Sequence, residues 1–161
     1  MDPIVCREHL EKLLVEEANA LTRLETLLDR EHDLLVANDV EELDRAGEAR
    51  QACIGELVRI EDERRSTCRM MNVPPDMAGL ERLLMWCDPS GSLKSRLADC
   101  ADRAGSCRAA NDRNGALVSA RMKKVEGMLD VLTGRAKETK VYGKQGAFET
   151  SQRSARVSIS V

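Results

Sequence analysis

Cysteine and histidine are the residue types here that most often bind metals or act as nucleophiles, and their spacing supports neither role. The chain has six cysteines and two histidines. No two cysteines form a Cys-x-x-Cys pair, the usual spacing of a zinc or redox site. We therefore expect no cofactor and no metal, and we interpret the cysteines as reduced thiols that serve as small core residues. They are Cys6, Cys53, Cys68, Cys87, Cys100 and Cys107.

The other familiar catalytic patterns are missing from the sequence as well. It contains neither a Gly-rich phosphate loop nor a Gly-x-Ser-x-Gly motif. A helical histidine phosphotransfer module is the least favoured of our alternatives, because neither His9 nor His32 is followed by a small residue that would leave its ring open. We expect both histidines on the surface. The sequence thus predicts a protein that is not an enzyme.

Composition favours an all-α fold. Aromatic residues make up only 2% of the chain, while 42% of it is hydrophobic and 33% charged. A core of Leu, Val, Ile, Met, Ala and Cys suits narrow helix-on-helix seams. No stretch approaches the roughly 20 apolar residues that cross a bilayer, and the first residues lack the features of a secretion signal. We expect no transmembrane segment and a cytoplasmic location.

A long apolar pattern runs from Arg7 to Ala37. In a heptad that begins at Arg7, apolar residues recur at the first, fourth and last positions, and Glu17 and Glu31 interrupt the fourth. About 30 helical residues would span roughly 45 Å, so this helix needs an equally long partner helix. The apolar residues are Leu10, Leu13, Leu14, Ala20, Leu21, Leu24, Leu27, Leu28, Leu34 and Leu35.

A second helix should follow after a short connection. Asp39 and Glu42 have the spacing of a capping box, which predicts a helix from about Val40 to Met71. So short a link forces the two helices to run antiparallel as a hairpin. Arg50 and Arg64 fall in the apolar seam of the second helix, and we expect them to snorkel or to pair with a seam glutamate of the first.

A short corner helix and a third long helix complete the predicted fold. Pro74-Pro75 ends the hairpin, and Trp86 is expected to be the buried anchor of the corner helix. From Leu93 to Leu132, apolar residues then alternate at steps of three and four, with Asn111 and Asn114 in consecutive seam positions. Because a buried amide without a hydrogen bond is costly, we expect these asparagines to form hydrogen bonds across the bundle, to water or to a partner.

After Leu132 the periodicity stops. We predict a helical bundle domain over residues 1–134 and a flexible basic tail over residues 135–161. The tail holds six Lys or Arg and two Glu, a net charge of +4, against −7 for the first 132 residues. An acidic body with a sequence pI near 5.5 argues against nucleic-acid binding. Tyr142 and Phe148 could anchor a protein partner.

Two motifs resemble a known family. The Asn-x-x-Asn-Gly run of Asn111, Asn114 and Gly115, together with the Tyr-Gly-x-x-Gly run of Tyr142, Gly143 and Gly146, is similar to FlgN, the bacterial flagellar export chaperone. The resemblance covers nearly the whole chain in length and layout. It implies a protein without enzyme activity that binds unpolymerised hook-filament junction proteins and delivers them to the flagellar type III export gate. It further implies that the C-terminal part contacts the cargo and that Tyr142 helps to dock on the cytoplasmic domain of the gate.

The last helix could supply the apolar surface that such cargo needs. Flexible, polarizable methionines adapt to more than one partner helix. The alternative is that these side chains only close the protein's own bundle, which we favour for Val118 and Val125. The candidate partner-binding residues of this helix are Met122, Val125, Met128, Leu129 and Leu132.

The sequence also leaves open a function of a different class, that of a structural protein. A structural coiled-coil or adaptor protein would use the leucine stripes to form oligomers and would have no export role. An export chaperone is expected to be a monomer or a weak homo-oligomer. Light scattering over a wide concentration range distinguishes these two alternatives.

Overall fold

The computed structural model describes residues 2–134, and its regular elements there are all helices. They are α1 (Pro3–Ala37), α2 (Val40–Met70), α3 (Met77–Cys87) and α4 (Ser92–Thr133). The all-α prediction is confirmed. The chain forms two compact units, Met1–Asn114 and Gly115–Val161, and α4 contributes to both. The predicted division at residue 134 stays a prediction, because the tail lies outside the described residues.

Helix α1 begins and ends at residues suited to those positions. The Asp2 carboxylate accepts a hydrogen bond from the backbone N–H of Ile4 at 2.8 Å, and Pro3 occupies the first turn. The helix ends at Asn38, which adopts a left-handed conformation with φ 58°. Most of its leucine stripe is buried within the first unit, as the heptad pattern predicted, while Leu27 and Leu34 are half-buried. The buried leucines are Leu10, Leu13, Leu14, Leu21, Leu24, Leu28 and Leu35.

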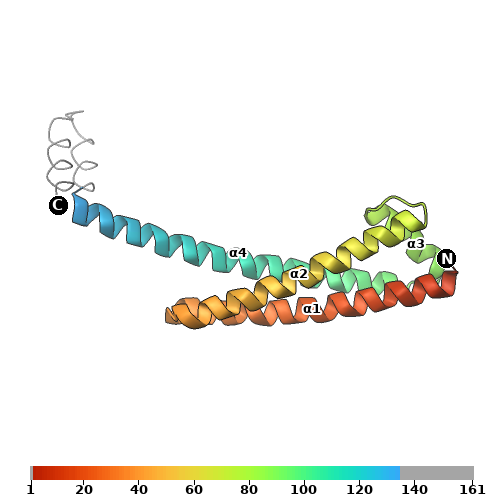
Figure 1. Ribbon diagram of the computed structural model, residues 1–161, viewed down its shortest axis with the longest axis horizontal. Coiled ribbons are helices and arrows are strands. Elements are labelled where there is room, and N and C mark those ends of the chain that lie inside the picture. The colour runs from red at the N-terminus through yellow and green to blue at the C-terminus, as the bar shows by residue number, and fades with distance from the viewer. Residues whose placement is uncertain (1, 135–161) are drawn as a thin grey trace, which may run out of the picture. The chain divides into compact units, whose positions relative to one another are not determined.

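Helix α2 returns antiparallel beside α1 (Figure 1). Asp39 caps it by accepting from the backbone N–H of Glu42 at 3.2 Å. The reciprocal half of the predicted capping box does not appear, because the Glu42 carboxylate instead pairs with Arg30 at 2.9 Å and with Arg45 at 2.6 Å.

The expected ion pairs across the hairpin are confirmed. Arg64 Nη2 lies 3.0 Å from Glu17 Oε1. Arg50 Nε lies 3.0 Å from Glu31 Oε1, and the Glu31 side chain is only 8% exposed. The two pairs lie at equivalent points of the antiparallel register, so they fix how α2 is aligned on α1.

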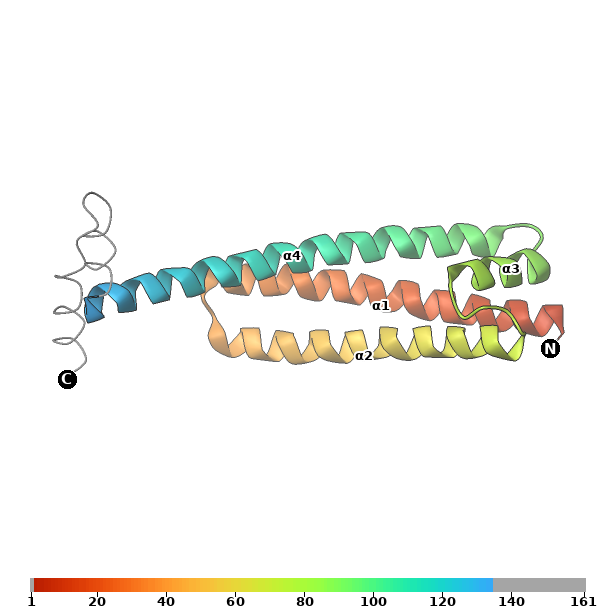
Figure 2. The same cartoon turned by 90° about the horizontal axis from the view of Figure 1, so that it is seen from above.

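Helix α3 lies at the end of the hairpin where α1 begins (Figures 1 and 2). The prediction that Trp86 is its buried anchor is wrong, since this residue is 44% exposed. Trp86 lies at the edge of the buried face, about 20° around the helix from Gly79 and about 100° from Cys87. Gly79 packs so closely on the preceding loop that a Cβ there would lie 1.8 Å from the backbone oxygen of Pro74. The buried face consists of Gly79, Leu80, Leu83, Leu84 and Cys87.

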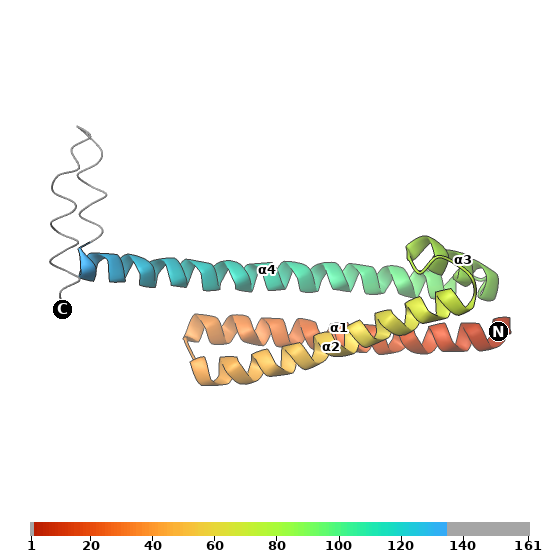
Figure 3. The same ribbon diagram turned by 45° about the horizontal axis from the view of Figure 1, so that its top comes forward.

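In the first unit, α4 lies along α1 and runs in the same direction (Figures 2 and 3). The apolar seam predicted for α4 is buried only in part. Ala104 and Asn111 are exposed, although the alternation of threes and fours placed both in the seam. From Cys100 onward only one position per heptad is buried, as expected for a contact with a single neighbouring helix. The buried residues of α4 are Leu93, Leu97, Cys100, Cys107 and Asn114.

All six cysteines are buried and free, which confirms their interpretation as small core residues. Burial, followed by the neighbouring thiols of Cys87 and Cys68, raises the pKa of Cys6 to about 11. The Cys6 thiol therefore stays protonated at neutral pH. The histidines differ from expectation. His9 Nε2 lies 3.1 Å from Thr67 Oγ1, and His32 is half-buried.

Candidate partner-binding site

The start of α4 is positioned by Asp88, a buried residue at the end of α3. Its carboxylate accepts from the backbone N–H of Leu93 at 2.7 Å and from the hydroxyls of Ser90 and Ser92 at 2.5 Å and 3.0 Å. These hydrogen bonds, led by that from Leu93 and assisted by Arg7 of α1, lower the pKa of Asp88 to about 2. One ionised side chain thus ties α3, α4 and α1 together.

Three polar side chains then hold α4 on α1 in a constant register. Each donates to a leucine carbonyl of α1, and the two residues of each pair are 86 positions apart in the chain. A constant offset at heptad spacing requires the helices to be parallel. The pairs are Cys100 Sγ to Leu14 at 3.7 Å, Cys107 Sγ to Leu21 at 3.5 Å, and Asn114 Nδ2 to Leu28 at 2.8 Å.

The two motif asparagines have different surroundings. Asn114 is only 6% exposed and bonds across the bundle. Asn111 is exposed. Gly115 is exposed too, and a Cβ added to it would contact nothing within 4 Å. The motif therefore combines a buried side chain that fixes the register with an exposed side chain that has no such structural task.

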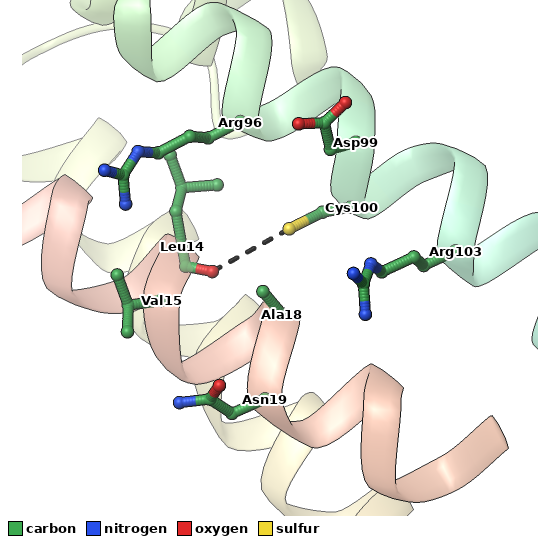
Figure 4. A pocket seen from close by; sticks show the side chains of 8 residues that line it. All are labelled: Leu14, Val15, Ala18, Asn19, Arg96, Asp99, Cys100 and Arg103. Carbon is green, nitrogen blue, oxygen red and sulfur yellow. Dashed lines mark hydrogen bonds between the residues drawn. The ribbon is translucent and has the colours of Figure 1, made fainter. Parts of the chain in front are cut away.

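A groove of about 280 Å³ lies along the α1–α4 seam. Figure 4 shows the side chains of both helices that line it. The arginines at its edge already have partners. Arg96 Nη2 lies 3.6 Å from Glu11 Oε1, and Arg103 donates to the Thr22 hydroxyl. We assign no ligand to this groove. Its lining residues are Leu14, Val15, Ala18, Asn19, Arg96, Asp99, Cys100 and Arg103.

The part of α4 in the second unit has an exposed apolar surface. Within residues 118–132, Met122 is 60% exposed and Leu132 is 80% exposed. Side chains of this size are normally buried when they have a neighbour to pack on, so this part of the helix is a candidate surface for a partner. The exposed apolar residues here are Val118, Met122, Val125, Met128, Leu129, Val131 and Leu132.

Five of these residues share one face of the helix. They recur at alternating steps of four and three residues, the spacing of a coiled-coil seam. We call this face, made of Val118, Met122, Val125, Leu129 and Leu132, the first seam. It includes four of the candidate residues predicted from the sequence, and those four are brought onto one surface. Met128 lies beside them.

Sequence reasoning missed Val131. This residue is 68% exposed and lies one helical turn from Met128. The i to i+3 spacing of Met128 and Val131 was the available signal, but Val131 falls outside the single seam that the alternation of threes and fours predicts. The candidate residues Tyr142, Gly143, Gly146 and Phe148 lie outside the described residues.

Neither a metal site nor a membrane span is found in the described part of the chain. Between residues 2 and 134, no group of three or more His, Cys, Asp or Glu side chains could hold a metal ion. No helix in that range is both long and apolar enough to span a bilayer.

Comparison with known families identifies the chain. The family model described as FlgN protein matches residues 1–150. This chain belongs to the FlgN family. FlgN proteins are chaperones of flagellar export, and the match includes the first seam and Tyr142. Searches of curated proteins and of solved structures found no match for this FlgN-family chain.

Proposed function

We propose that this FlgN-family chain is a cytosolic export chaperone for unpolymerised hook-filament junction proteins. It binds their assembly-prone terminal helices, prevents premature assembly, and delivers them to the flagellar type III export gate. No enzymatic step is part of this function. Family membership supports the general role, and the exposed apolar helix of the second unit supports the mode of cargo binding.

The observation that carries this proposal is a contrast between the two units. In the first, the leucine stripe of α1 is buried by the protein's own helices. In the second, Met122 and Leu129 are 60% and 54% exposed on a regular seam. An amphipathic cargo helix would bury such a seam in the helix-in-groove manner, and the methionine would adapt to different cargo sequences.

Delivery is assigned to the tail. Tyr142 matches the family's tail tyrosine, and aromatic side chains often anchor protein partners. A single aromatic anchor of this kind buries a small area, which keeps the complex reversible. Reversibility suits a chaperone that must release its cargo at the gate.

Cargo capture is tested by titrating the purified full-length chain with a purified hook-filament junction protein. We expect a stoichiometric complex. Replacing two first-seam residues together, Met122→Ser with Leu129→Ser, should weaken binding by at least about 100-fold, since each loses roughly 1.5–3 kcal/mol of apolar burial. Met85→Ser, at a methionine of α3 that is 64% exposed, is the matched control and should leave the affinity unchanged. An equal loss of affinity in Met85→Ser would contradict the proposal that the first seam binds the cargo.

Delivery needs a separate experiment. Tyr142→Ala should leave cargo affinity unchanged while weakening binding of the chaperone–cargo complex to the cytoplasmic domain of the export gate. Tyr142→Phe, which keeps the ring, separates packing from hydrogen bonding. Loss of cargo binding and gate binding together would show that one surface serves both, contrary to the proposal.

The structural coiled-coil alternative remains testable. It requires the α1 stripe to bind other copies, yet Leu10 and Leu28 are 2% and 1% exposed within the first unit. Light scattering should show a monomer or a weak dimer. A tight, large oligomer would favour the alternative.

A further inference from the structure

Gly115, the last residue of the Asn-x-x-Asn-Gly motif, has no structural task in the helix that contains it. A Cβ added there would meet nothing within 4 Å. Its backbone is helical within α4, so no positive φ requires a glycine either. Glycine is less favourable than alanine in a helix interior, because it loses more conformational entropy when the helix forms. The motif therefore weakens α4 at this point.

Helix α4 contains two further glycines with open surroundings, Gly105 and Gly127. Gly105 lies between Cys100 and Cys107, whose thiols both donate to carbonyls of α1. Opening the helix at Gly105 would disturb those hydrogen bonds. Gly127 lies inside the first seam, so opening the helix there would divide the proposed cargo surface. Neither glycine is a suitable place for α4 to bend.

At Gly115, opening the helix leaves both the hydrogen bonds to α1 and the first seam intact. Gly115 follows directly after Asn114, the last buried residue of α4, whose amide bonds to Leu28 of α1. An opening at Gly115 releases backbone carbonyls of residues 111–115. Four of these five residues are exposed, so water can replace the lost hydrogen bonds.

The first seam lies on the same side of α4 as the residues that pack on α1. At about 100° per residue, Val118 and Leu129 point in the direction of Cys100 to within about 20°. As far as Asn114 this side of α4 faces α1, which itself continues beyond Leu28. A cargo helix on the first seam must use the same side. A straight α4 therefore gives a cargo helix longer than the seam little room beyond Val118.

We propose that Gly115 is a hinge of α4, at which the helix opens locally so that the segment carrying the first seam turns away from the side occupied by α1. This inference rests on the proposed function, because cargo is the ligand that favours the bent form. A ligand shifts such an equilibrium only as far as it prefers one form. The preference comes from the room that bending gives a cargo helix. Asn114 keeps its hydrogen bond in both forms and lies on the fixed side of the hinge.

The opening is tested first without cargo, by hydrogen exchange of single backbone amides followed by NMR on the full-length chain. A hinge at Gly115 predicts faster exchange for the amides of residues 115–119 than for those of residues 100–107. Gly115→Ala should slow exchange at residues 115–119 about fivefold, because alanine favours the closed helix. The matched control Gly105→Ala should leave exchange at residues 115–119 within about twofold. Equal effects of the two variants there would overturn the hinge.

The link to cargo is tested by titration calorimetry with a purified hook-filament junction protein. We expect Gly115→Ala to weaken binding about fivefold and Gly105→Ala to leave it within about twofold. Gly115→Pro favours the bent form, because proline lacks the N–H and its ring clashes with the carbonyl of Asn111. This variant should bind at least as tightly as the unaltered chain. The opposite order, with alanine raising the affinity and proline lowering it, would show that cargo needs the unbroken helix and would overturn the hinge.

Two further outcomes separate this inference from the proposed function. Equal binding by the unaltered chain and by Gly115→Ala would overturn the hinge and leave the proposed function standing. Failure of the unaltered chain to bind any junction protein would remove the proposed function and this inference with it.

Discussion

At the residue scale, Asn114 and Asn111 share a motif but not an environment. Asn114 Nδ2 donates to the backbone oxygen of Leu28 at 2.8 Å and is only 6% exposed, whereas Asn111 is exposed. A buried amide in a helix seam specifies register, because any shift would leave it without a partner.

This difference predicts unequal effects of alanine at the two sites. Asn114→Ala should lower the free energy of unfolding by about 1–2 kcal/mol, since it removes a buried hydrogen bond and leaves a small cavity. Asn111→Ala should change it by less than about 0.5 kcal/mol. Urea unfolding followed by circular dichroism measures both. Equal destabilisation would contradict the assignment, and weaker cargo binding by Asn111→Ala alone would mark Asn111 as a contact residue.

Asp88 predicts how stability depends on acid pH. Its pKa is lowered from 3.8 to about 2, so its stabilising effect is complete above about pH 4 and is lost as the pH falls through about 2. Asp88→Asn should lower the Tm at pH 7 and flatten the dependence of Tm on pH between 4 and 2. Thermal unfolding monitored by circular dichroism measures this, with Asp62→Asn as the exposed control. If the dependence of Tm on pH were the same in Asp88→Asn as in the unaltered chain, the stabilising role of the Asp88 carboxylate would be contradicted.

At the element scale, the ion pair between Arg64 and Glu17 aligns α2 on α1. The two side chains are 11% and 17% exposed. Glu17→Ala should cost about 2–3 kcal/mol because it leaves the largely buried guanidinium of Arg64 with only the more exposed Glu61, whose Oε2 lies 3.3 Å from Arg64 Nε. The double change Glu17→Leu with Arg64→Leu should be close to neutral, since desolvation no longer opposes folding. Urea unfolding of the single and double variants measures how strongly the two side chains are coupled. A double variant whose free energy of unfolding falls by the sum of the losses from the separate changes would contradict the coupling.

Glycines in two helices give opposite predictions. A Cβ at Gly127 in α4 meets nothing within 4 Å, whereas at Gly79 in α3 it would lie 1.8 Å from the Pro74 oxygen. Gly127→Ala should stabilise its helix by about 1 kcal/mol and raise cargo affinity by preordering it. Gly79→Ala should destabilise the fold. Circular dichroism and titration check both, and lower affinity in Gly127→Ala would contradict a helical binding site.

The elements were predictable because their boundaries are encoded locally. Asp2 and Asp39 mark helix starts because their side-chain carboxylates accept from backbone N–H groups of the first turn. The Pro74-Pro75 pair marks an end because proline has no backbone N–H to donate. The pairing of arginines with glutamates across the hairpin followed from heptad positions. The exposure of Trp86 could not be predicted in this way, since it depends on which face of a short helix meets the hairpin. The prediction that Ala104 lies in the buried seam was wrong, because the spacing of apolar residues does not show how many helices pack on α4.

The candidate site was predictable to a similar extent. The spacing from Met122 to Leu132 identified an apolar face, but it could not tell an internal core from a free surface. Within the second unit, Val118 and Val125 are 41% and 55% exposed. This exposure disagrees with our expectation that these two valines close the protein's own bundle, and the binding role of the face stays a proposal.

At the scale of the whole molecule, the two units differ in what they bury. The first unit buries its leucines, its cysteines and Asn114, and it supports α4 from Asp88 onward. The second presents apolar residues on a helix that belongs to both. We propose that only the second unit contacts cargo and gate, so that cargo can change while the first unit stays the same.

Hydrogen exchange measured by mass spectrometry, with and without a purified hook-filament junction protein, tests this division most directly. The account predicts that cargo slows backbone amide exchange across residues 118–132 and leaves exchange in α1 and α2 unchanged. Slower exchange confined to α1 and α2, with residues 118–132 unaffected, would contradict it.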